Sequence, residues 1–134
     1  MEETPIHRLL AWLSDTLGQD PWYAAHGVPI LIENRLDILA EVERAVLSAT
    51  GCALILRAPR AENNRPALNV TLELLALENP TLNRCRAQAA TALDAIWHAA
   101  LALDGPNLLL RTVEHAADGD LFEARAAFDC IVTR

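Results

Sequence analysis

The side chains that most often carry out chemistry in proteins are scattered along this sequence rather than grouped. Four histidines fall on different expected elements, and no two stand four residues apart, as paired zinc ligands on one helix do: His7, His26, His98 and His115. Three cysteines include no close pair such as C-x-x-C: Cys52, Cys85 and Cys130. We therefore expect reduced thiols, no disulfide framework and no metal site.

Pairs of residues suited to nucleophilic or acid–base catalysis also lack the spacing that a catalytic site needs. Cys85 and His98 share one expected helix and stand about 20 Å apart along its axis, beyond hydrogen-bond reach. Asp118 and Asp120 flank a glycine, which is typical of a hairpin turn. The chain has no lysine and no glycine-rich phosphate loop. The sequence thus predicts neither enzyme activity nor a bound cofactor.

The composition indicates one folded domain over residues 1–134. Hydrophobic residues make up 52% of the chain and aromatic residues 4%, so the core must consist of Leu, Ile, Val and Ala. A net charge of −7 argues against a nucleic-acid binder, whose affinity comes from neutralising phosphates. No apolar run reaches the roughly 18–20 residues of a membrane span, and the acidic first residues do not resemble a secretory signal. We expect a protein that is not secreted and has no membrane partner.

The first third of the chain predicts a helix, a loop and a short strand. Residues 1–18 are expected to form an N-terminal helical segment. Its helix follows the cap Thr4, has Pro5 in the first helical position, carries leucines at helical spacing, and stops at Gly18. Residues 19–27 are expected to form a loop, because proline and glycine interrupt the pattern. Residues 28–32 are expected to form a strand at a sheet edge, because Pro29 cannot donate a ladder hydrogen bond.

The remaining pattern predicts an α+β fold. The expected elements are a helix over 36–50, strands over 52–57 and 68–77, a helix over 85–103, and strands over 108–114 and 122–132 joined by a turn at 116–120. We expect a mixed, mostly antiparallel sheet of two hairpins (a β-β-α-β-β core), with the helices on one face and the N-terminal helix before it.

A polar segment between two expected strands is the strongest candidate for a binding surface. Residues 57–67 form an expected hairpin arm that carries Arg57, Arg60 and Arg65. Long loops in compact domains are often functional, and arginine is enriched in protein interfaces. A solvated hairpin tip is the plainer interpretation. If the arm is functional, its arginines contact a neighbouring subunit.

One segment supplies a family resemblance. The strand that ends in Glu78-Asn79-Pro80 is followed by Thr81-Leu82-Asn83-Arg84 and an alanine-rich helix. This pattern resembles the bacteriophage tail terminator and tail completion (minor tail) proteins, as do residues 28–38 and the closing hairpin. The resemblance covers roughly residues 28 to 134, and it leaves the N-terminal helix and the Trp22-Tyr23 loop without a counterpart.

The resemblance implies a structural subunit without cofactor or enzyme activity. Such a subunit forms a ring with itself, commonly a hexamer, at the head-proximal end of the tail tube in the virion, where it contacts tail-tube and connector proteins and DNA passes through. On this basis Asn83 and Arg84 join the expected subunit contacts. Three alternatives stay open: a head–tail joining protein, a small chaperone- or antitoxin-like module with a heterologous partner, and an enzyme with a pocket between sheet and helices.

Overall fold

The structure is a computed structural model that describes residues 5–32, 52–57, 59–79, 91–105, 108–118 and 121–133. Its described elements, in chain order, are α1 (Pro5–Gly18), α2 (Pro21–His26), β1 (Ile30–Ile32), β2 (Cys52–Leu56), β3 (Arg60–Asn64), β4 (Ala67–Glu78), α5 (Ala92–Leu103), β5 (Leu108–Asp118) and β6 (Leu121–Thr133). The expected helix over 36–50, Thr4, Asn83 and Arg84 lie outside the described residues.

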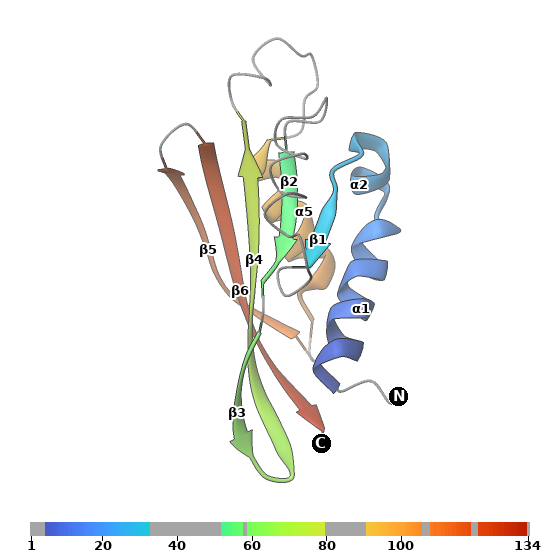
Figure 1. Cartoon of the computed structure of the whole chain (residues 1–134), viewed down its shortest axis with the longest axis vertical. Helices are drawn as coiled ribbons and strands as arrows, with labels where there is room; N and C mark the ends of the chain where they lie inside the picture. The colour runs from blue at the N-terminus through green and yellow to red at the C-terminus, as the bar shows by residue number, and fades with distance from the viewer. Residues whose placement is uncertain are drawn as a thin grey trace.

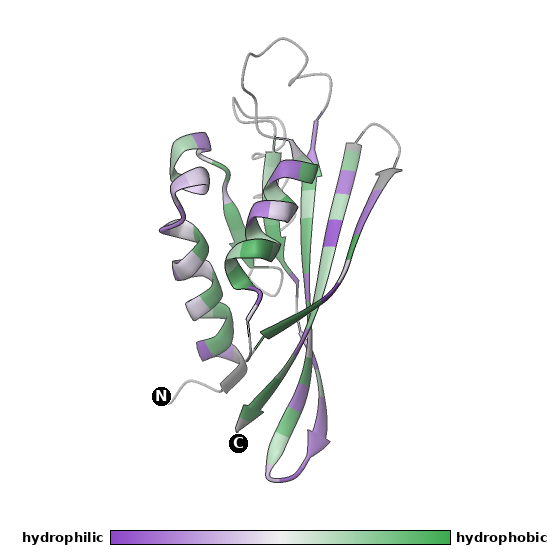
Figure 2. Cartoon of the chain, turned by 180° about the vertical axis from the view of Figure 1, so that it is seen from behind, coloured by the Kyte–Doolittle hydropathy of each residue, from purple (hydrophilic) through white to green (hydrophobic). Residues whose placement is uncertain are grey.

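The strands form a six-stranded sheet in the order β1-β2-β4-β6-β5, with β3 paired to β4 beside this path. β1 is parallel to β2, and the other pairs are antiparallel. The helices α1 and α5 lie on the same face of the sheet (Figure 1, Figure 2). The predicted α+β class, the mixed sheet and the N-terminal helix are confirmed, and the first strand lies at the edge among the described strands.

The main core lies between this sheet face and the two helices, and a smaller buried cluster of Ala53, Ile55 and Leu77 lies on the opposite face. Helix α1 contributes Leu10, Leu13 and Leu17, which match the predicted apolar stripe. Helix α5 faces the sheet largely through alanines, which let it pack closely, and β4 contributes even-numbered side chains such as Leu72 and Leu74. We call the opposite sheet face, to which the odd-numbered side chains of β4 belong, the outer face.

The expected loop over residues 19–27 is wrong, because α2 occupies most of it. The Asp20 side chain accepts a hydrogen bond of 2.9 Å from the Trp22 N–H, and Pro21 takes the first helical position. Gly27 ends the helix with a left-handed φ of 63°, a conformation that favours glycine. Tyr23 is buried, and its hydroxyl donates a hydrogen bond to the Ala95 carbonyl of α5. A short helix thus fastens α1 to α5.

The expected helix over 85–103 is too long at its start, since α5 begins at Ala92. Thr91 has an extended backbone and caps the helix: its hydroxyl accepts a bond of 3.1 Å from the Asp94 N–H and donates one of 2.7 Å to the Asp94 carboxylate. The first of these bonds satisfies the Asp94 N–H, one of the backbone groups that the first turn leaves free. Residues 85–90 of the expected helix lie outside the described residues.

The arm expected over residues 57–67 is not the long loop that its polar sequence suggested, because β3 fills most of it. β3 pairs with the first residues of β4 in five register positions, and only Arg65 and Pro66 turn between them, joined by a cis peptide bond. The closing hairpin is longer than predicted, since Asp118 pairs with Leu121. Residues 116–118 of the predicted turn therefore belong to β5, and residues 119–120 lie outside the described residues.

Candidate assembly surface

The β3–β4 hairpin forms an arm that projects beyond the helical layer. We define the arm as residues 60–71, namely β3, the turn and the first residues of β4. Figure 1 shows it extending past the lower end of α1, beside the end of β6. Every residue of β3 is exposed, and Figure 2 shows this strand as hydrophilic. Because β3 buries no side chain in the core, its sequence is free to serve a contact.

A row of charged side chains, which we call the charged ladder, crosses the outer face at the base of the arm. The Arg57 guanidinium lies 3.1 Å from the Glu73 carboxylate, and Arg125 lies 3.9 Å from the same carboxylate and 3.2 Å from Glu123. The Arg57 N–H also donates to the Glu73 carbonyl at 3.0 Å. These pairs join β4 to β6 and to the residue that follows β2. Exposed pairs contribute little stability each, and their main effect here is to fix the arm's base.

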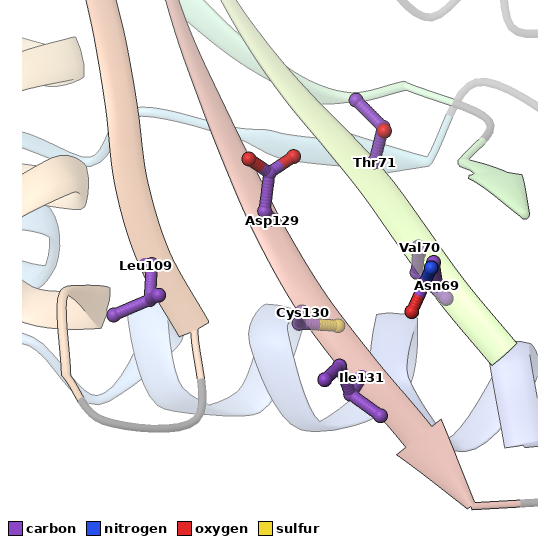
Figure 3. Close-up of a pocket in the computed structure, with 7 residues that line it drawn as sticks. All are labelled: Asn69, Val70, Thr71, Leu109, Asp129, Cys130 and Ile131. Carbon is purple, nitrogen blue, oxygen red and sulfur yellow. The ribbon is translucent and has the colours of Figure 1, made fainter. Parts of the chain in front are cut away.

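A shallow hollow lies on the outer face beside this ladder. Its volume is about 470 Å³, and it is lined by Asn69, Val70, Thr71, Leu109, Asp129, Cys130 and Ile131. Figure 3 shows these residues on β4, β6 and β5. Leu109 is 56% exposed and Ile131 70% exposed, while the Asp129 carboxylate lies 3.7 Å from Arg111. The hollow therefore offers two aliphatic side chains around one half-exposed carboxylate.

The free edges of the described strands are poorly suited to pairing with another strand. β1 is three residues long and follows Pro29, which has no N–H. β3 presents the charges of Arg60 and Glu62, and β5 has a register shift between Leu110 and Thr112 that interrupts its ladder. Short, charged and bulged edges resist edge-to-edge association. Contacts with other chains are therefore expected through side chains on the sheet and helix faces rather than through pairing of strand edges.

The outward side of α5 carries a second exposed surface. Leu93, Trp97 and Leu101 recur at every fourth residue and are 40%, 43% and 69% exposed. Residues at this spacing lie on one side of a helix, so the three form a continuous apolar row, which we call the α5 ridge. Tryptophan is among the residues most enriched in interface hot spots.

Trp22 joins α2 to α5 by ring stacking. Its indole stacks on the imidazoles of His26 and His98, with ring centroids 4.4 Å and 4.7 Å away and interplanar angles of 23° and 14°. His26 Nδ1 lies 2.9 Å from the Trp22 carbonyl, which makes this nitrogen the donor. The stack gives these two histidines a structural role that sequence spacing could not reveal.

The described cysteines are poorly suited to nucleophilic chemistry. Burial raises the pKa of Cys52 to about 12, and the nearby carboxylates of Glu78 and Asp94 add to the effect. Burial, followed by the charge of Asp129, also raises the pKa of Cys130. Thiols with raised pKa values stay protonated at neutral pH and react slowly. Within the described ranges, no three His, Cys, Asp or Glu side chains gather in a group that could hold a metal ion.

Glu78 serves the fold. It is a buried charged residue, 7% exposed at the end of β4, and its carboxylate accepts a bond of 2.9 Å from the Ala92 N–H. That N–H is one of the first in α5 and has no partner within the helix. The helix dipole favours a negative charge there. The first residue of the Glu78-Asn79-Pro80 motif therefore fixes the start of α5 against the sheet.

The structure spreads the described members of the predicted contact set along the arm and its base. Arg57 is engaged with Glu73 at the arm's base, Arg60 lies on β3, and Arg65 lies at the exposed tip. Sequence reasoning missed the hollow on the neighbouring strands, including Leu109 and Asp129. Its residues come from three distant segments, and only strand register places them side by side.

The sequence matches no protein-family model, and a search of curated proteins finds no match. Among the described helices, none has both the length and the apolar character needed to cross a membrane.

Proposed function

We propose that this chain is a structural subunit of a phage or phage-like tail. In this role it forms a ring, hexameric by the family resemblance, at the head-proximal end of the tail tube as a tail terminator or completion protein. The observation that carries the proposal is the arm, a paired hairpin in which all five residues of β3 are exposed. A ring subunit needs a surface that reaches the next copy, and this projection can supply it.

The chemistry of the described residues supports a structural role. The pKa values of Cys52 and Cys130 are raised, and Glu78 is occupied in capping α5. The hollow is open on a sheet face, while enzymes usually place their substrates in enclosed, mostly apolar pockets. The net charge of −7 suits a ring through which DNA passes without binding. A head–tail joining role would use the same surfaces.

Mass measurement of the purified chain tests the proposal. We expect light scattering after size-exclusion chromatography, and native mass spectrometry, to show a closed ring, alone or on addition of a tail-tube protein. The partner is included because a ring subunit that caps a tube gains contacts from it. A strict monomer that binds neither tail-tube nor connector protein would contradict the proposal.

The α5 ridge favours a second candidate function, a small module that binds a heterologous partner as chaperones and antitoxins do. Its exposed Trp97 and flanking leucines resemble the apolar face that a partner helix or groove covers. This role predicts a one-to-one complex in which Trp97→Ala weakens binding. An affinity purification that recovers a toxin or effector, with no virion proteins, would favour it over the tail role.

A further inference from the structure

We infer that the tip of the arm from one copy docks into the hollow on the outer face of another copy. The inference rests on the proposed assembly function and names the two surfaces that meet. In the docked pair, the Arg65 guanidinium binds the Asp129 carboxylate, and the Pro66 ring packs against Leu109 and Ile131.

The two surfaces are complementary in charge and in apolar character. The tip presents one cation and one apolar ring, both exposed. The hollow presents the half-exposed carboxylate of Asp129 beside two largely exposed aliphatic side chains. In the described part of the chain, Asp129 has one ion pair, the 3.7 Å contact with Arg111. Arginine and a carboxylate form paired hydrogen bonds with specific geometry, so a second arginine fits this site.

A single copy cannot make this contact with itself. The five register pairs between β3 and β4 hold the arm extended, and five residues of strand span about 17 Å. Thr71 and Asp129 lie at the base of the arm, directly opposite each other in the sheet and in line with Arg60, while Arg65 lies at the far end. The tip therefore points away from its own hollow and can only fill the hollow of a second copy.

The edges of the sheet disfavour strand pairing between copies and do not interfere with a tip-to-hollow contact. Continuation of the sheet from copy to copy needs long, regular edges, and β1, β3 and β5 are short, charged or bulged. A tip-to-hollow contact joins different surfaces on the two copies. It therefore leaves one free tip and one free hollow until the chain of subunits closes into a ring.

Charge reversal tests the contact with the full chain. Arg65→Glu places two carboxylates together, and Asp129→Arg places two guanidiniums together. We expect each variant to weaken the contact about tenfold or more, and sedimentation velocity at up to about 1 mM measures the shift towards monomer. The matched controls are Arg8→Glu and Asp15→Arg, which make the same charge changes at exposed positions on α1. Thermal unfolding of each variant checks that the fold is kept.

Mixing the two reversed variants gives the decisive measurement. In an equimolar mixture, the acidic tip of the Arg65→Glu copy meets the basic hollow of the Asp129→Arg copy. The native tip of the Asp129→Arg copy meets the native hollow of the Arg65→Glu copy, so we expect assembly to return.

Four results would contradict the docking or the ring. Failure of the mixture to assemble, or an assembly that both single variants leave unchanged, would overturn the docking while leaving the proposed function standing. A wild-type chain that is monomeric at about 1 mM would also overturn the docking. A complementing assembly of only two copies would support the docking and contradict the ring.

Discussion

Replacement of Glu78 tests whether one buried carboxylate joins β4 to α5. In Glu78→Ala the Ala92 N–H loses its acceptor in a site closed to water, since Ala92 is 0% exposed. An unsatisfied buried donor costs about 1–3 kcal/mol, and the lost interaction with the helix dipole adds about 0.3–1 kcal/mol. Release of the carboxylate from its buried position offsets part of this sum. We expect the free energy of unfolding to fall by about 2–3 kcal/mol.

A second variant separates the hydrogen bond from the charge. Glu78→Gln keeps a carbonyl oxygen that can accept from Ala92, removes the charge and adds a buried N–H₂ group. We expect it to cost about 1 kcal/mol, less than the alanine variant. Equal costs for the two variants would assign the effect to charge rather than to the hydrogen bond.

Urea unfolding followed by circular dichroism measures both costs. For a chain of this size, about 2–3 kcal/mol corresponds to a fall in Tm of roughly 6–15 °C. Glu114→Ala is the control, since this exposed carboxylate on β5 should change stability by about 0.5 kcal/mol or less. A change of that small size for Glu78→Ala would refute the reasoning. It would also show that the start of α5 is held by the Thr91 cap alone.

Two further predictions concern stability. The free energy of unfolding should fall as the pH rises above 9.0, the ordinary pKa of a thiol, towards 12, because Cys52 keeps its proton in the folded chain and loses it on unfolding. Urea titrations across this range should show a slope of at most about 1.4 kcal/mol per pH unit from this group, and Cys52→Ala should reduce the slope. Tyr23→Phe removes the bond to the Ala95 carbonyl and should cost about 1 kcal/mol in the same assay. Unchanged stability would show that burial of the ring alone holds α2.

Periodic patterns predict the parts of the fold whose apolar residues repeat. The leucines of α1 and the alternation along β6 place these elements within a few residues of their bounds. Polar and short elements escape this kind of pattern. β3 has no alternation of its own and exists because β4 offers it a partner. For α2, Asp20 and Pro21 are helix-start residues, but proline also interrupts a helical pattern, and the sequence alone does not distinguish the two roles.

The start of α5 is in principle readable from the sequence. Thr91 and Asp94 have the spacing of a capping box, and the alanines before them hide this signal because they continue the helical pattern. The hollow and the charged ladder are not predictable in this way. Glu73 and Arg125 are close because β4 and β6 pair in one particular register, and no local pattern specifies a register between distant strands.

The pleat of the arm limits how its length can vary. Successive side chains of β3 and β4 point to opposite faces, so a hairpin lengthened by one residue on each strand turns every residue beyond the insertion to the other face. Two added residues on each strand return every side chain beyond the insertion to its original face and move the tip about 7 Å further out. The reach of Arg65 can therefore change only in steps of that size if its orientation is kept. A related chain with a longer or shorter arm should differ by an even number of residues in each strand.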